Sequence, residues 1–378
     1  MSAADGEREL LRQTVEDLLA GHCTPARVAA AVSGWDAALW RALEDTGLTL
    51  AGSPEEAGGS GGDLWAAADI AAAAGAAAAP VPLAETLAAG MLLARAGLTI
   101  PPGPLTVALS ADAVPGPGTI VHRVPYGRLA TTVITGPGED GDWLAVLAPA
   151  GRGGTGRGGI GRNLAGEPRD EVGLGGDAEA HAAPPGTADY ARRRLRLFRS
   201  LLIAGAAQRA LDLTVTYVRE REQFGRPLAR FPTVQQELAR MAGEVALIAA
   251  ATQAAVAAED SLPAADGLPA EDGLVGGDAV SAVLAAKAQA SHGAGIVAAI
   301  AHQLHGAIGT TEEHRLRLTT TRLWSWRDED GSEAECFAEL GRAALGAATQ
   351  AGGLWPWLSG SPGTGPAGSY GVDAPFTL

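Results

Sequence analysis

The sequence predicts a mostly helical α+β protein in which a helical region, a small β region and a second helical region follow one another. Near both ends of the chain, apolar residues recur every three or four positions, as on the buried face of a helix. Between about residues 100 and 186 they form short runs separated by Gly, Pro and Asp, which is typical of strands and turns. The 378 residues are 47% hydrophobic and 19% charged, enough apolar content for two or three packed domains.

We expect the first helical region over residues 1–99, with an amphipathic helix at Glu7–Leu19. Gly and Pro then interrupt the pattern, and two alanine-rich helices are predicted around Trp65–Ala79 and Leu83–Ala96. Because alanine is small, these helices can approach their neighbours closely.

The β region is predicted over residues 100–187, where the runs Thr131–Thr135 and Trp143–Leu147 are typical of strands. The glycine-rich stretch Gly151–Arg162 contains the GxGxxG pattern of dinucleotide-binding folds. That fold needs a helix to begin directly at the glycines, and the residues at Asn163–Pro168 break any such helix. We therefore interpret the stretch as a loop.

The second helical region is expected over residues 188–352 and an irregular tail over 353–378. Helical periodicity returns from Ala191, and two further apolar helices are predicted at Val234–Ala257 and Val280–Leu304. The segment Glu259–Asp278 is rich in Asp, Gly and Pro and has no periodicity, which indicates an exposed connector between antiparallel helices.

Charge and cysteine content narrow the class of protein. The 28 Lys and Arg against 43 Asp and Glu give a net charge of −15, which argues against nucleic acid or an anionic membrane as the main partner. Two cysteines without a Cys/His cluster exclude a disulfide framework and a zinc-finger-type metal site. The first residues are acidic, unlike a signal peptide, and the alanine-rich run Ala66–Ala79 is too short to span a bilayer. We therefore expect a cytoplasmic location.

Two separated segments resemble the flavin-binding motifs of the acyl-CoA dehydrogenase family. Residues Arg221–Phe231 read RxQFGxPLxxF, and Gln303–Gly309 is similar to the family's QxxGGxG stretch. Pro54–Gly59 resembles the family's PExxGG, so the resemblance covers most of the chain. It implies a helical N-terminal domain, a central β-barrel and a C-terminal four-helix bundle. It also implies FAD as cofactor, an acyl-CoA substrate, an external electron acceptor and a dimeric or tetrameric assembly, homomeric or heteromeric.

The resemblance assigns cofactor contacts to both motifs. Arg221 suits a flavin pyrophosphate because its planar guanidinium stays charged and offers forked donors, although it can also be a solvated helix-end arginine. Gln223 is expected to donate to the cofactor, whereas Phe224 is equally compatible with core packing. In the second motif, Gln303 is expected to bond the adenosine end of a neighbouring subunit's FAD, and Gly306 lets the backbone approach it.

Desaturation of a thioester requires a carboxylate that removes the α proton while the β carbon gives hydride to the flavin. The family's catalytic glutamate, in the pattern Glu-Gly-Thr, falls without gaps on Asp330, which Gly331 and Ser332 follow. Asp330 is therefore the predicted base, and its acidic neighbours are expected to raise its proton affinity. An ordinary solvated turn is the other interpretation. The family's second location for a base, here Arg192–Phe198, contains no carboxylate.

The chain also departs from the family pattern. The usual flavin-side segments are missing and Leu105–Asp112 stands in their place, while Pro232 and Ala307 replace a glutamine and a glycine of the motifs. Two functions therefore stay open. The first is flavin-dependent α,β-desaturation of an acyl-CoA, and the second is a non-catalytic partner subunit that completes another subunit's FAD site.

Overall fold

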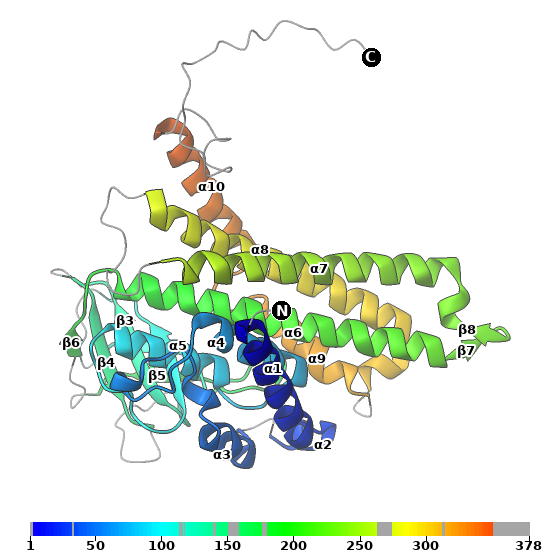
Figure 1. Ribbon diagram of the computed structural model, residues 1–378, viewed down its shortest axis with the longest axis horizontal. Coiled ribbons are helices and arrows are strands. Elements are labelled where there is room, and N and C mark those ends of the chain that lie inside the picture. Colours follow the sequence, from blue (N-terminus) through cyan, green and yellow to red (C-terminus); the bar gives the residue numbers. More distant parts are fainter. Residues whose placement is uncertain are drawn as a thin grey trace, which may run out of the picture.

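The computed structural model describes residues 3–31, 34–112, 116, 118–138, 141–149, 159–175, 180–262, 274–311 and 314–350. Most of the glycine-rich stretch, the middle of the predicted connector and the predicted tail at 353–378 lie outside these residues. Helices form most of the described chain, with a small group of strands at one end of the long helices (Figure 1). The predicted mostly helical α+β class is confirmed, while the domain limits themselves remain a prediction.

The N-terminal part consists of five helices, α1 (Ala3–His22), α2 (Pro25–Ala30), α3 (Ala37–Asp45), α4 (Leu64–Ala77) and α5 (Leu83–Arg95), with the short 3-10 turns η1 (Leu48–Leu50) and η2 (Glu55–Ala57) between α3 and α4. Side-chain caps fix where several helices begin. The carboxylate of Asp36 accepts from the N–H groups of Ala38 and Leu39, and that of Asp63 accepts from Ala66. These caps satisfy backbone N–H groups that have no partner within their own helix.

The strands of the central part form two sheets around one core. A four-stranded sheet has the order β1 (Leu105–Leu109), β3 (Thr131–Gly136), β4 (Trp143–Leu147) and β6 (Ala180–Ala182), and β2 (Ile120–Pro125) pairs with β5 (Arg169–Gly173) in a second sheet. Only the β1–β3 pair among these is parallel. Buried residues of both sheets, among them Val124, Ile134, Ala145 and Val172, share one apolar cluster.

The C-terminal part is a bundle of long helices, built from α6 (Thr187–Glu220), α7 (Pro232–Asp260), α8 (Leu274–His305), α9 (Leu316–Trp326) and α10 (Glu333–Gln350). Between α6 and α7 the chain makes a small hairpin, β7 (Glu222–Gln223) and β8 (Arg226–Pro227), followed by the 3-10 turn η4 (Leu228–Arg230). A further 3-10 turn, η5 (Gly306–Thr310), follows α8. The hairpin projects from the end of the bundle opposite to the strands (Figure 1).

Helices α4 and α6 cross at very short range. A Cβ atom added to Gly205 would lie 1.8 Å from the carbonyl oxygen of Ala72, and one added to Gly75 would lie 2.1 Å from that of Leu202. Both glycines are therefore needed for the two backbones to touch. This contact joins the N-terminal helices directly to the bundle.

By length and composition, α7 and α8 are apolar enough to cross a bilayer. In α8, 67% of the most apolar window is buried, as expected for the central helix of a bundle. In α7 only 33% is buried, so this helix carries an apolar surface that the described residues leave uncovered.

Candidate functional site

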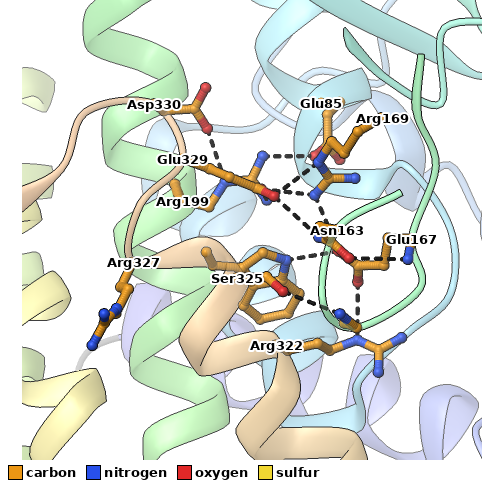
Figure 2. A network of polar contacts seen from close by, with 12 residues as sticks. Glu85, Asn163, Glu167, Arg169, Arg199, Arg322, Ser325, Arg327, Glu329 and Asp330 are labelled. Atoms are coloured by element: carbon orange, nitrogen blue, oxygen red, sulfur yellow. Dashed lines mark hydrogen bonds and ion pairs between the residues drawn. The ribbon is translucent and has the colours of Figure 1, made fainter. Parts of the chain in front are cut away.

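The predicted base, Asp330, lies in the loop between α9 and α10 and belongs to a buried group of charged side chains. We name this group the ion cluster; its members are Glu85, Glu167, Arg169, Arg199, Arg322, Glu329 and Asp330. They come from α5, β5 with the segment before it, α6, α9 and the α9–α10 loop, and they converge on one another in Figure 2.

Arg199 is the centre of one half of the ion cluster. Its Nε atom donates to Oδ2 of Asp330 at 2.8 Å, and its Nη2 atom donates to Oε1 of Glu85 at 3.1 Å. Its Nη1 atom lies 3.4 Å from Oε2 of Glu329. The Arg199 side chain is 3% exposed, so its charge is compensated by these carboxylates and not by water.

Arg169 and Glu167 organise the other half. Arg169 binds Glu329 through two hydrogen bonds, from Nε at 2.9 Å and from Nη2 at 2.7 Å. Such a forked contact is the strongest geometry for an arginine and a carboxylate. Glu167 accepts hydrogen bonds at 2.9 Å from both Asn163 and the indole of Trp326, and Arg322 forms an ion pair with it at 3.0 Å.

A buried lysine completes the charge balance and fixes the loop that carries Asp330. Lys287 of α8 is fully buried, and its Nζ atom donates to Oγ of Ser291 and to the carbonyl oxygens of Arg327 and Gly331, at 2.7, 2.9 and 2.7 Å. Asp330 itself has a positive φ of 57°. A non-glycine residue keeps this conformation only where its surroundings impose it, here through bonds from Arg199 to the side chain and from Arg196 to the carbonyl oxygen.

The ionisation of the ion cluster follows from these contacts. Burial alone would raise the pKa of Asp330, but the charge and hydrogen bond of Arg199, with Lys287, lower that pKa. The expectation that acidic neighbours raise it was therefore wrong. Burial raises the pKa of Glu85, which Arg199 only partly offsets. Burial would also raise the pKa of Glu167, yet Arg322 and Arg169 outweigh it and lower that pKa to about 2.

The cavity lined by three members of the ion cluster, Glu85, Glu167 and Arg199, is small. The cavity lined by Glu85, Tyr126, Glu167, Arg199 and Trp326 measures about 10 Å³, room for about one water molecule. Glu329, which the solvated-turn interpretation would expose, is 8% exposed. That interpretation of the segment is therefore wrong.

The predicted cofactor contacts lie at the other end of the bundle. Arg221 ends α6, Gln223 belongs to β7, and Gln303 and Gly306 lie at the end of α8; all four are exposed. Arg221 has no ion-pair partner among the residues that the structure describes. Phe224 is 89% exposed and contacts Phe231 at 6.2 Å between ring centroids, so the core-packing interpretation of this residue is wrong.

Three aromatic rings bring the two motifs together. The ring of Tyr217, one helical turn before Arg221, stacks on His305 at a centroid distance of 4.4 Å. His314 approaches the edges of both rings, at 6.2 Å from Tyr217 and 4.8 Å from His305. The structure thus places two segments, separated by some 80 residues of sequence, on one exposed surface.

The two groups of predicted site residues are far apart within one chain. Arg199 lies on α6 and Arg221 caps the C-terminal end of that helix, so at about 1.5 Å of rise per residue their separation is about 33 Å. A single flavin bound near Asp330 would have to span this length for its adenosine end to reach Arg221 of the same chain.

The exposed end of the bundle fits the phosphate and adenosine part of FAD. Arg221 offers uncommitted forked donors, Gln223 and Gln303 offer amide groups, and Gly306, with a φ of 64°, has no atom within 4 Å of the position where a Cβ would stand. The closed ion cluster offers no comparable space for a ring system. The fit is therefore to an extended anionic ligand at the bundle end.

The fold consists of a helical N-terminal region, a two-sheet centre and a bundle of long helices, which is the three-part architecture that the resemblance to acyl-CoA dehydrogenases implied. The sequence model described as "Acyl-CoA dehydrogenase, N-terminal domain" matches residues 5–98, and "Acyl-CoA dehydrogenase, C-terminal domain" matches residues 188–333. The acyl-CoA dehydrogenase IpdE2 of Mycolicibacterium smegmatis is 33% identical over 82% of this chain and 90% of its own length. The chain belongs to the acyl-CoA dehydrogenase family, as the sequence motifs predicted.

Solved structures agree with this assignment. A variant of the Tcur3481–Tcur3483 steroid acyl-CoA dehydrogenase has a TM-score of 0.78 and 26% identity, and covers 91% of this chain and 99% of its own. A chain of the ChsE4–ChsE5 complex of Mycobacterium tuberculosis has a TM-score of 0.76 and 22% identity, over 90% of this chain and 97% of its own, and shares the fold.

Sequence reasoning missed most of the ion cluster. It noted the arginine-rich start of α6 only for its lack of a carboxylate. The signal available in the sequence was weak, because Arg192, Arg196 and Arg199 recur at helical spacing like a polar face, whereas in the structure every residue from Arg193 to Ile203 is buried. A charge in such a position needs a buried partner of opposite sign.

Proposed function

We propose that this chain is the non-catalytic subunit of a heteromeric acyl-CoA dehydrogenase, in which its bundle end completes the FAD site of a second, catalytic subunit. The observation that carries this proposal is the ion cluster. Its charged side chains pair with one another around Asp330, whose Oδ2 atom accepts from Arg199 at 2.8 Å, and the cavity beside Glu85, Glu167 and Arg199 measures about 10 Å³, too small for an acyl chain.

The chemistry of Asp330 supports the same conclusion. A general base works best with a pKa near the operating pH. Ion pairing with Arg199 instead lowers the pKa of Asp330 and occupies its Oδ2 atom. Removing the α proton would neutralise Asp330 and break its ion pair with Arg199, whose side chain is 3% exposed and would keep only Glu85 and Glu329 as partners, and such a change is costly.

An association surface is present on α7. Between Met241 and Ala258 this helix has one charged residue, Glu244, and one exposed polar side chain, Gln253. Its other exposed residues are small or apolar: Ala242, Gly243, Ala246, Leu247, Ala250, Ala254 and Ala257. Exposed apolar surface of this extent marks a protein contact. Two related solved structures carry two protein names each, Tcur3481–Tcur3483 and ChsE4–ChsE5, in keeping with a two-protein assembly.

In the proposed complex, bound FAD would supply the acceptor for the β hydride, and the partner's own residues would supply the base. Arg221 of this chain would hold the pyrophosphate by charge-assisted hydrogen bonds, and Gln223 with Gln303 would bond the adenosine end. The alternative is an active site of this chain's own with Asp330 as base, which the alignment of Asp330-Gly331-Ser332 on Glu-Gly-Thr favours.

The test is coexpression with acyl-CoA dehydrogenase chains encoded beside its gene, followed by flavin analysis and turnover. We expect the isolated chain to lack tightly bound FAD and the complex to carry it. In the complex, Arg221→Ala should weaken FAD binding, while Asp330→Asn should leave turnover within about 2-fold, as should the exposed control Asp328→Asn. A loss of roughly 100-fold or more in Asp330→Asn, the contribution of a positioned base, in a complex that keeps its FAD and its Tm and with Asp328→Asn unaffected, would refute the proposal and identify Asp330 as the base.

A further inference from the structure

The rings of Tyr217, His305 and His314 form what we name the aromatic stack, at the exposed end of the bundle. Tyr217 and His305 are nearly parallel, with an interplanar angle of 20°, and His314 meets them at 84° and 66°. These are the offset and edge geometries in which aromatic pairs attract one another. The aromatic stack therefore stabilises this end of the bundle by more than the burial of its apolar area alone.

His305 is an uncharged member of the stack. It is 3% exposed, and its Nδ1 atom lies 2.8 Å from the carbonyl oxygen of Ala301. A carbonyl only accepts, so Nδ1 carries the proton and Nε2 does not; Nε2 has no hydrogen-bond partner among the described residues. Burial lowers the pKa of His305 to about 4. What this imidazole contributes at neutral pH is its flat surface.

Two of the three rings, those of Tyr217 and His305, each lie next to one of the two exposed segments. The carbonyl oxygen of Tyr217 accepts the N–H of Arg221 at 2.8 Å, the last helical bond before the hairpin. His305 follows Gln303 by two residues and directly precedes Gly306, where the backbone turns with positive φ. The η5 turn closes over it, since a Cβ on Gly309 would lie 2.9 Å from that of His305.

The hairpin packs on Phe231, whose ring centroid lies 4.2 Å from the Arg226 guanidinium and 6.2 Å from the ring of Phe224, and it has little burial of its own. Every residue from Arg221 to Arg226 is exposed, and the strand pairing of β7 with β8 covers two residues on each side. Two-stranded hairpins of this kind are marginal alone. The orientation of the hairpin toward the η5 turn therefore depends on the position at which α6 ends against α8. The aromatic stack lies at that position.

We propose that Tyr217 and His305 are positioning residues, whose stacked rings fix the Arg221 hairpin and the Gln303–Gly306 turn relative to each other before a flavin binds. The inference rests on the proposed function, because it assumes that both segments contact one FAD. Its physical basis is preorganisation: a site already ordered does not lose the entropy of ordering its side chains upon binding.

The test compares ring removal with ring replacement in the assembled complex. Tyr217→Ala and His305→Ala should weaken FAD binding by about 2- to 13-fold, the range that corresponds to one aromatic pair. Tyr217→Phe and His305→Phe keep a ring and should bind within about 2-fold of wild type. In the same complex without FAD, hydrogen exchange at residues 219–226 and 303–311 should be faster in the alanine variants and unchanged in the phenylalanine variants.

Val297→Ala is the matched control, since Val297 is fully buried on the same helix, away from the stack. We expect it to lower Tm without changing FAD affinity or the exchange of these segments. If Tyr217→Ala and His305→Ala bind FAD as Val297→Ala does while Arg221→Ala is weakened, the positioning role is refuted and the proposed function stands. If Arg221→Ala also binds as wild type, the proposed function itself fails.

Discussion

Replacing Arg199 by alanine should destabilise the protein strongly, because it leaves buried carboxylates without their cation. Arg199 contacts Glu85 and Asp330 at 3.1 and 2.8 Å, and both depend on it. Glu329 keeps its forked contact with Arg169. Removing one partner of a buried ion pair costs about 3–5 kcal/mol, so we expect a loss of about 4 kcal/mol at pH 7.

The sign of the pH dependence follows from the same contacts. Asp330 has its pKa lowered in the folded protein, so its contribution to stability is present above its ordinary pKa and is lost as the pH falls. Without Arg199, the carboxylates of Glu85 and Asp330 bind protons more readily. The stability deficit of Arg199→Ala should therefore be larger at pH 8 than at pH 5.

The assay is thermal unfolding of wild type and variant at both pH values. At about 2–4 °C per kcal/mol for domains of 150–250 residues, a loss of this size lowers Tm by roughly 8–16 °C. Arg192→Ala is the control on the same helix, since Arg192 pairs with Asp189 at the surface and such pairs contribute about 0–1 kcal/mol. A deficit for Arg199→Ala no larger than that of Arg192→Ala, or equal at both pH values, would refute the reasoning.

Two further predictions concern packing and acid stability. Gly205→Ala should lower the unfolding free energy by about 1–3 kcal/mol, since the new methyl group overlaps the Ala72 carbonyl. The control Gly243→Ala, on an open face of α7, should raise the unfolding free energy by about 0.4–1 kcal/mol. If urea unfolding shows equal shifts for the two variants, the close α4–α6 contact is contradicted. The pKa of Glu167 is about 2, below its ordinary 4.5, so its stabilisation is present above pH 4.5 and is lost toward pH 2. Glu167→Gln should lower the unfolding free energy by about 3 kcal/mol at pH 7. If the difference in unfolding free energy between variant and wild type does not become smaller between pH 4.5 and 2, the ion pairs of Glu167 with Arg169 and Arg322 are contradicted.

The sequence by itself determined the elements and the family. Periodicity placed helices at Leu83–Ala96 and Val234–Ala257, close to the observed α5 and α7, because apolar spacing and capping act over a few neighbouring residues. The strand at Trp143–Leu147 was predicted to the residue. The two flavin motifs identified the family, since each is a short run of specific residue types that alignment can recognise without any structure.

Only the tertiary structure decided what surrounds Asp330. Glu85, Arg169, Arg199 and Glu329 come from four elements separated by up to 244 positions, and no local pattern relates them. Whether a carboxylate is a base or a structural ion depends on the charges within a few ångströms of it and on the water they exclude. Those distances follow from how the helices and sheets pack together, which spacing along a chain does not encode.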